Sequence, residues 1–247
     1  GNPGAHDLSS MTFNRVLLQA IGSRQRFSAS TVDQIPKQVS SGMMFGSVSS
    51  VPVPDLDRTQ YLLMLGANPY ESNGSLCTAP DFPGRLEAMQ ARGGKLVVVD
   101  PRKSRTAEQA DEWLAIRPGT DALLLAAIAN TLASDGLNVL EQRLHNYLNG
   151  LAEVVAALAP FTPEAVAAST GIDAATIRRI ARELRDASSS AVYGRIGTCT
   201  TAFGTTASWL VDVVNIFTGN LDRVGGAMFS LPVAGSGNTH SAPGRGK

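Results

Sequence analysis

The sequence contains very little cysteine, and this limits the metal centres that it can build. Cys77 and Cys199 are the only two cysteines in the chain of 247 residues, and no CxxC pair occurs. A zinc ribbon or an iron–sulfur cluster needs about four closely placed ligands, so this chain by itself builds neither. The pattern is typical of two buried thiols, with a disulfide as the alternative, and low cysteine use fits the reducing cytoplasm.

A surplus of charge and a long apolar run are also missing. Twenty-one basic residues balance twenty-one acidic ones, which argues against nucleic acid as the main partner, because phosphate binding needs excess Lys and Arg. The most apolar stretch, 122–129, is far shorter than the roughly 20 residues that cross a bilayer, so we expect no membrane span. Residue 1 is Gly rather than Met, and no signal-peptide pattern follows it, which indicates a piece of a longer protein.

What is present is an alternation of short apolar runs and helical segments. Residues 61–65, 95–100, 113–116 and 191–193 have the composition of strands, and 83–92 has helical spacing between the first two. Apolar strands joined by a helix are typical of βαβ units, in which a parallel sheet is buried on both faces. The predicted fold class is therefore α/β, a parallel sheet with helices on both faces.

Apolar spacing and cap residues predict the remaining helices. A first helix begins at Ser9 or Ser10 and ends at Gly22, and its apolar face is expected to lie in the core. We expect residues 1–232 to form one domain and 233–247, rich in Gly, Ser and Pro, to be a mobile tail. The other predicted helices cover 34–43, 120–136, 138–148, 151–158, 174–187 and 203–217, and one more begins at Thr162.

Ligands of an open parallel sheet bind beyond the carboxyl ends of the strands, where the first candidate loop is GANPYES, 66–72. Gly66 lets the backbone approach a ligand, and Pro69 stiffens the turn. Asn68 and Ser72 offer neutral donors and acceptors that suit phosphate or sugar oxygens. The alternative is an ordinary turn, and the spacing differs from the GxGxxG of NAD and FAD sites.

The second and fourth loops also carry groups suited to a nucleotide. Asp100 ends a buried strand, where a carboxylate can accept hydrogen bonds from ribose hydroxyls, and Arg102 offers a planar cation for phosphate or a base carbonyl. A weak surface ion pair is the alternative for these two residues. Gly194 and Gly197, in YGRIGT, give the fourth loop a permissive backbone, although glycine is common in any turn.

The third loop, RPGTD, leads directly into the helix predicted at 120–136. Gly119 and Thr120 lie where the N–H groups of the first helical turn and the positive end of the helix dipole face outward. Asp121 has two possible roles. It can cap the helix, or its carboxylate can accept the N1–H and N2–H of a guanine, a pair of donors that adenine lacks.

Four segments occur here together and in one order: GANPYES at 66–72, GGKLVVVDPR at 93–102, IRPGTDALLL at 116–125 and TGNLDRVGG at 218–226. In these segments, within about 54–229, the chain resembles the molybdopterin oxidoreductases of the dimethyl sulfoxide reductase type, which include formate dehydrogenases and nitrate reductases. The resemblance implies a Rossmann-like domain that holds one of two molybdopterin guanine dinucleotides, with molybdenum or tungsten as the metal. It also implies a small-molecule substrate and an electron-transfer partner.

The resemblance further implies a place for each candidate residue. Asn68 and Ser72 lie near the pyrophosphate or the ribose of the dinucleotide. Asp100 and Arg102 lie by the nucleoside, and Asp121 recognises guanine.

The resemblance places 194–198 on the pterin and metal side. Many members of the family ligate the metal through Cys or selenocysteine. Here the usual spacing before Phe45 and Gly46 reaches Asp33, which makes Asp33 the candidate metal ligand and catalytic residue, with Ser28 and Ser30 as neighbours. Complete enzymes often have an N-terminal domain with a [4Fe–4S] cluster and a C-terminal domain that closes over the cofactors. Neither is present, so we expect the isolated chain to fold but to be inactive.

Two other hypotheses remain open. The chain could be the nucleotide-binding central domain of another α/β enzyme, such as a thiamine-diphosphate enzyme, although that class gives no reason for the RPGTD helix start. It could also be a non-catalytic interaction module in which the Gly-rich loops are only turns.

Overall fold

The computed structural model describes residues 8–25, 27, 29–136, 144 and 146–230. The tail expected at 233–247 lies outside the described residues, and so does most of the helix expected at 138–148. The domain boundary at residue 232 therefore stays a prediction.

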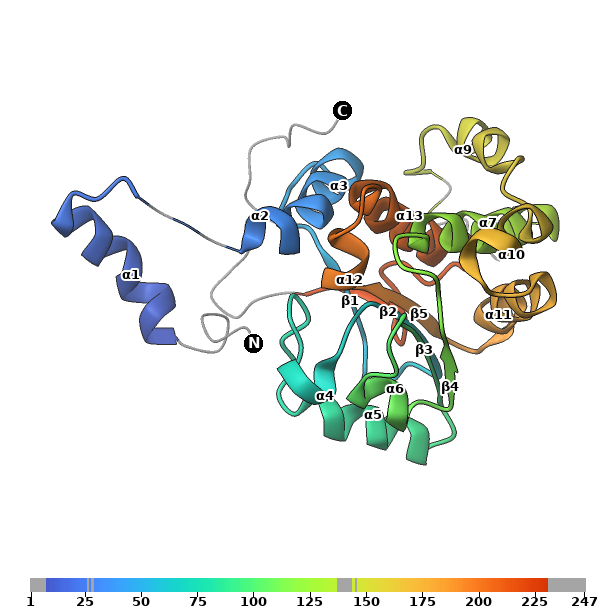
Figure 1. Ribbon diagram of the computed structural model, residues 1–247, viewed down its shortest axis with the longest axis horizontal. Coiled ribbons are helices and arrows are strands. Elements are labelled where there is room, and N and C mark those ends of the chain that lie inside the picture. Colours follow the sequence, from blue (N-terminus) through green and yellow to red (C-terminus); the bar gives the residue numbers. More distant parts are fainter. Residues whose placement is uncertain (1–7, 26, 28, 137–143, 145, 231–247) are drawn as a thin grey trace.

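A four-stranded parallel sheet forms the centre of the molecule (Figure 1). Its strands are β2 (Tyr61–Leu65), β3 (Lys95–Val99), β4 (Glu112–Leu114) and β5 (Ser190–Gly194), in the spatial order β4-β3-β2-β5. Every neighbouring pair is parallel, and Leu65 lies opposite both Val99 and Gly194. The loops that follow these strands consequently begin at one edge of the sheet, as the sequence predicts.

Helices cover both faces of this sheet, which confirms the predicted α/β class. Successive strand residues point to opposite faces, so Leu63 and Leu65 belong to one buried cluster while Leu62 and Met64 belong to the other. The first cluster includes side chains of α7 (Asp121–Ser134), α11 (Ala174–Asp186) and α13 (Gly204–Phe217). The second includes side chains of α5 (Phe82–Ala91), and α4 (Pro69–Ser72) and α6 (Arg105–Gln109) lie on the same side (Figure 1).

Cap residues start two of the predicted helices as expected. The Thr162 side chain accepts a hydrogen bond from the N–H of Ala165 at the start of α10 (Pro163–Thr170), and Asp173 accepts one from Thr176 at the start of α11. Satisfying these otherwise unpaired N–H groups fixes where each helix begins. The other helices are α2 (Ser30–Asp33), α3 (Ile35–Phe45), α9 (Leu151–Leu158) and α12 (Ile196–Cys199).

Two short strands were not predicted. β1 (Pro52–Pro54) and β6 (Ala227–Phe229) form an antiparallel pair of their own. Proline at both ends of β1 hides it from a sequence pattern, because proline is generally depleted in strands. The pair joins a segment before the main sheet to one after α13.

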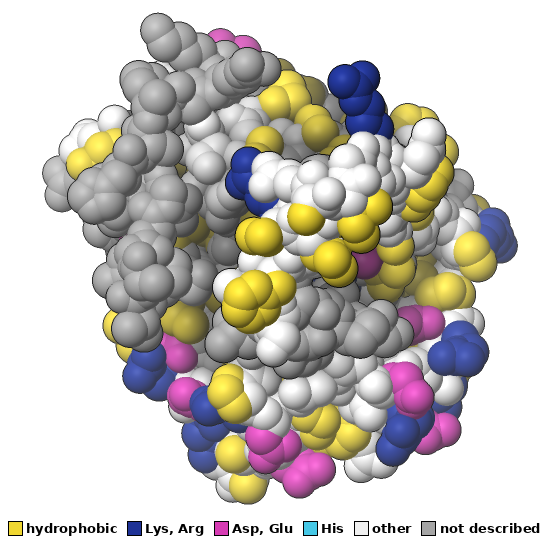
Figure 2. All heavy atoms as spheres, turned by 90° about the vertical axis from the view of Figure 1, so that its left-hand side faces the viewer, with side chains coloured by type: hydrophobic (Ala, Val, Ile, Leu, Met, Phe, Trp, Pro, Cys, Tyr) yellow, Lys and Arg dark blue, Asp and Glu magenta, His cyan; other side chains and the backbone are white. Residues whose placement is uncertain are grey.

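The expectation that the first helix buries its apolar face is wrong. α1 (Leu8–Ile21) forms and ends before Gly22, but Phe13, Val16, Leu17 and Ile21 are 58 to 66% exposed. α1 stands away from the sheet (Figure 1), and hydrophobic side chains are visible on this side of the molecule (Figure 2). Helical spacing shows that a helix has an apolar face, but it does not show that this chain supplies the partner for that face.

Both cysteines are buried and unbridged, as predicted. Burial raises the pKa of the Cys77 thiol to about 11, which keeps it protonated and unreactive at neutral pH. Among the described residues, no individual helix combines the length and the apolar character needed to cross a membrane, although α9 and α10 taken together as a bent pair meet both criteria.

Candidate functional site

The strand-end edge of the sheet brings the four predicted loops together. Gly66 follows β2, Asp100 follows β3, and Arg195 continues β5, with its N–H donating to the carbonyl of Leu65 at 3.1 Å. The third loop leaves β4 and enters α7 at Asp121. Parallel strands that end in register place all these groups on the same side of the molecule, where α/β proteins bind their ligands.

Two glycines let the first and fourth loops touch each other. A Cβ on Gly66, which has φ of +55°, would lie 2.6 Å from the Cα of Gly197, and the reverse contact is equally close. The N–H of Gly197 donates to the carbonyl of Gly66 at 3.0 Å. The space that Gly66 leaves open is thus filled by the neighbouring loop rather than by a ligand. Gly194 is similarly enclosed by Thr198 and Val211.

The first and second loops are joined through an amide. Asn68 Oδ1 accepts hydrogen bonds from the N–H and the hydroxyl of Thr106, at 3.2 and 2.8 Å. Pro69 is buried as the first residue of α4, where its missing N–H costs nothing. Ser72 Oγ donates to the carbonyl of Asn68 and accepts from the N–H of Gly74. The polar groups predicted for ligand binding therefore also hold the loop together.

A small hollow at this edge collects four of the predicted residues. Its lining includes Asp33, Asn68, Pro69 and Ser72, together with Arg195 from the fourth loop. Asp33 ends α2 and reaches the hollow from outside the sheet, and Ser30 begins the same helix. Ser28 lies outside the described residues.

Asp33 forms an ion pair with Arg195, at 2.8 Å between Oδ1 and Nη2. Its side chain is 16% exposed, so one face of the carboxylate still borders the hollow. The described residues contain no group of three His, Cys, Asp or Glu side chains that could hold a metal. A metal bound at Asp33 would need most of its ligands from another group.

Arg195 is a residue of this edge that the sequence analysis missed. It is 4% exposed, and its Nη2 donates to Asp33 and to the hydroxyl of Ser75. Among the described residues, Nε and Nη1 have no hydrogen-bond partner. The signal in the sequence was an arginine directly after a buried strand, a position where burial requires that a charge be paired.

Two carboxylates lie beside the third loop. Asp100 Oδ1 accepts from the N–H of Arg102 at 2.9 Å, and burial raises the pKa of Asp100 despite that bond and the Arg102 charge. Asp121 is 6% exposed, and burial, with a smaller effect of the Asp100 charge, raises its pKa to about 6. No ion pair of Asp121 occurs within the described part of the chain. Arg102 itself is exposed.

The start of α7 differs from a standard cap. Thr120 occupies the N-cap position but makes no side-chain cap bond, because its hydroxyl donates to the carbonyl of Arg117 at 2.7 Å. Asp121 is the first residue of the helix rather than its cap, so the capping role considered for it is wrong. Gly119 has φ of +81° and open space around it, which leaves the approach to the helix start clear.

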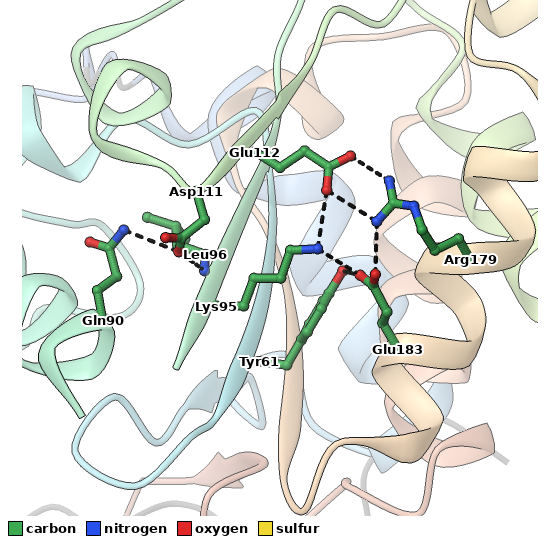
Figure 3. Close-up of polar contacts among 8 residues, drawn as sticks. All are labelled: Tyr61, Gln90, Lys95, Leu96, Asp111, Glu112, Arg179 and Glu183. Carbon is green, nitrogen blue, oxygen red and sulfur yellow. Dashed lines mark hydrogen bonds and ion pairs between the residues drawn. The ribbon is translucent and has the colours of Figure 1, made fainter. Parts of the chain in front are cut away.

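A second charged cluster lies at the opposite edge, where the strands begin (Figure 3). Lys95 pairs with Glu112 at 3.2 Å and with Glu183 at 2.9 Å, and Arg179 bridges the same two carboxylates. Burial raises the pKa of Glu183, but hydrogen bonds from Lys95, Arg179 and Tyr61 outweigh burial and lower it overall. Every charge in this cluster is balanced, so we assign it to holding α11 against the sheet.

The strand-end edge, by contrast, has unbalanced groups that fit an added ligand. Within the residues that the structure describes, Arg195 Nε is a buried donor without an acceptor and Asp121 is a buried carboxylate without a cation. Both situations are energetically costly. A ligand with anionic oxygens and with N–H donors would relieve both. The arrangement is typical of α/β domains that bind ligands beyond the carboxyl ends of their strands.

Comparisons with known proteins narrow this class. The chain matches the family described as molybdopterin oxidoreductase over residues 3–242. It is 30% identical over 220 residues to the thiosulfate reductase molybdopterin-containing subunit PhsA of Salmonella typhimurium, a match that covers 89% of this chain and 28% of that protein. It is 27% identical over 216 residues to the alpha subunit of F420-dependent formate dehydrogenase 1 of Methanococcus maripaludis, covering 87% and 30%. Acetylene hydratase from Pelobacter acetylenicus has the same fold, with a TM-score of 0.72 and 25% identity over 89% of this chain and 29% of that one.

The chain belongs to the molybdopterin oxidoreductases of the dimethyl sulfoxide reductase type. It spans about 30% of the length of the curated relatives described above, so it corresponds to one part of larger proteins. Two of these relatives are named as subunits. Membership in this family argues against the central domain of a thiamine-diphosphate enzyme, because such a domain belongs to a different family.

Proposed function

We propose that this chain is the domain of a molybdenum or tungsten oxidoreductase that binds a molybdopterin guanine dinucleotide. The observation that carries the proposal is the placement of Asp121 at the start of α7 on the strand-end edge. This carboxylate is buried, its pKa is raised, and no cation among the described residues pairs with it. A carboxylate in that setting gains most from a ligand that donates two hydrogen bonds to it. The N1–H and N2–H of guanine are such a pair.

The neighbouring residues would hold the rest of the dinucleotide. Asp100 lies close enough to Asp121 for their charges to interact, and it would accept hydrogen bonds from the ribose. Arg102, exposed on the same loop, would pair with a phosphate or a base carbonyl. Asn68 and Ser72 border the hollow and would contact the pyrophosphate or ribose.

The metal would lie near the hollow that Asp33 borders, with 194–198 on the pterin side. When bound, molybdopterin and its metal would supply the redox chemistry, which is the transfer of an oxygen atom or a hydride to or from a small substrate. The chain itself would bind and orient the cofactor, and Asp33 would be its contribution to the metal.

The same proposal explains why the chain alone should not turn over substrate. One domain would contact the dinucleotide from one side only and would leave the metal open to water. The electron-transfer partner and any iron–sulfur cluster would belong to other parts of the complete enzyme. Measurable turnover by the isolated chain would contradict this part of the proposal.

The test is to measure what the full-length protein retains. We expect the purified protein to release guanine nucleotide and molybdopterin on denaturation, quantified per mole by chromatography. Asp121→Ala should lower both, whereas Asp186→Ala, which removes an exposed carboxylate on α11, should leave both unchanged. Full occupancy in Asp121→Ala would remove Asp121 from the site, and absence of guanine from the unaltered protein would contradict the dinucleotide.

A further inference from the structure

Arg195 has more hydrogen-bond donors than the described residues use. Its guanidinium carries five N–H groups, and only Nη2 has partners, namely Asp33 Oδ1 and Ser75 Oγ. Nε and Nη1 are buried and unpaired within the described part of the chain. Leaving donors of a charged group unpaired in a buried position is strongly unfavourable, so the structure calls for another acceptor.

The backbone holds Arg195 firmly in this position. Its N–H extends the β5 ladder to Leu65, and its carbonyl accepts from the N–H and the hydroxyl of Thr198, at 2.8 and 2.7 Å. A side chain anchored in this way at the end of a rigid strand is well suited to position a ligand. Because Tyr193 and Arg195 are two residues apart in extended chain, both side chains point toward the loop that contains Ser75.

That loop has an unusual backbone. Asn73 and Leu76, on either side of Ser75, both have positive φ, 53° and 62°. Residues other than glycine adopt this conformation at a cost. The strained loop brings the Ser75 hydroxyl to Arg195 on the wall of the hollow.

We propose that Arg195 binds an oxyanion in this hollow, with an unpaired N–H of Nη1 or of Nε donating to one of its oxygens. The shared chemistry is a negatively charged group with at least two oxygens, which guanidinium recognises better than other cations do. Its source is either the pyrophosphate of the dinucleotide or a small oxyanion that serves as substrate. The choice of source rests on the proposed function, while the binding of an oxyanion does not.

Asp33 competes for the same cation. Its carboxylate already takes one donor of Arg195, and its negative charge repels any anion that enters the hollow. The two residues should therefore have opposite effects on anion binding. This opposition separates a binding role from general damage to the fold, because damage weakens binding in both variants.

The test uses the full-length protein prepared without cofactor from a host that cannot make molybdopterin. Calorimetric titration with inorganic pyrophosphate, and separately with nitrate and formate, measures the affinity of each anion. Arg195→Gln should weaken binding of at least one of these anions by about tenfold or more, and Asp33→Asn should strengthen it by about threefold. Arg105→Gln is the matched control, because Arg105 pairs with Glu71 at 3.0 Å but is exposed, and it should change none of the three affinities.

The pattern of losses identifies the source. If Arg195→Gln weakens the binding of pyrophosphate alone, Arg195 contacts the cofactor. If it weakens the binding of nitrate or formate alone, Arg195 contacts the substrate. Unchanged affinity for all three anions in Arg195→Gln, or weaker binding in Asp33→Asn, overturns the proposal. Failure of guanine binding at Asp121 would leave these titrations unaffected, so the two proposals fail independently.

Discussion

Replacing Asp121 by Asn should stabilise the cofactor-free protein while weakening its hold on the cofactor. Burial raises the pKa of this carboxyl to about 6, and the negative charge of Asp100 adds to the effect. Above that pH the folded protein must keep a charge in a poorly solvated place. Asn has nearly the same shape and carries no charge, so it removes this cost. It also lacks the second acceptor oxygen that guanine would need.

The sign of the pH dependence follows from the raised pKa. An aspartate in the unfolded chain titrates near about 3.9, so between about pH 4 and pH 6 the folded state holds the extra proton. The free energy of unfolding therefore falls as pH rises through this window. At about 1.4 kcal/mol for each pH unit, Asp121 contributes a loss of about 2 to 3 kcal/mol, which is complete above pH 6 to 7.

The assay is denaturant unfolding of the cofactor-free protein at several pH values from pH 4 to pH 8, monitored by circular dichroism. The difference in unfolding free energy between Asp121→Asn and the unaltered protein should grow by about 2 to 3 kcal/mol in favour of the variant as pH rises. Equal stability curves across this range would refute the raised pKa. Full cofactor occupancy in Asp121→Asn would refute the binding role, because the variant lacks the second carboxylate oxygen that guanine would need.

Three further predictions concern a buried ion pair, two glycines and the exposed first helix. Asp212→Asn should lower the unfolding free energy by about 3 kcal/mol or more, because it removes the partner of the buried Lys37, whose Nζ lies 2.6 Å from the Asp212 carboxylate. Replacing Lys37 by Met and Asp212 by Leu together should recover most of this free energy, measured by denaturant unfolding. Gly66→Ala should cost about 3 kcal/mol, since its Cβ would meet backbone at 2.6 Å, whereas Gly93→Ala, with φ of +87° and open space, should cost only about 1 kcal/mol. Leu17 has a side chain that is 58% exposed, so Leu17→Ser should change the free energy of thermal unfolding by less than about 0.5 kcal/mol. A decrease of more than about 2 kcal/mol would show that the apolar face of α1 is buried after all.

Local signals were sufficient to predict the sheet and most helices. The apolar run 61–65 is β2 with the predicted bounds, and it is fully buried as a central parallel strand requires. The cap residues Thr162 and Asp173 bond to the third residue after each of them, as cap chemistry dictates over a single turn. These features depend on residues within about ten positions of one another, which a sequence displays directly.

The missed features depend on pairs that are far apart in the chain. Arg195 and Asp33 are separated by 162 positions, and Lys37 and Asp212 by 175. A periodic pattern shows that a residue is buried or exposed, but it does not show which distant charge it meets. For the same reason the sequence suggested that Gly66 faces a ligand, when its neighbour is the backbone of Gly197.

These two ion pairs together explain how Asp33 is held over the sheet. Asp33 and Lys37 are four residues apart, on α2 and α3, and their charges are opposite. Asp33 pairs with Arg195 on the fourth loop, and Lys37 pairs with Asp212 on α13. If the α2–α3 segment shifted by one turn, each buried charge would approach a like charge or none, and both outcomes are strongly unfavourable. The segment therefore has one favoured position, and that position sets where the carboxylate of Asp33 borders the hollow.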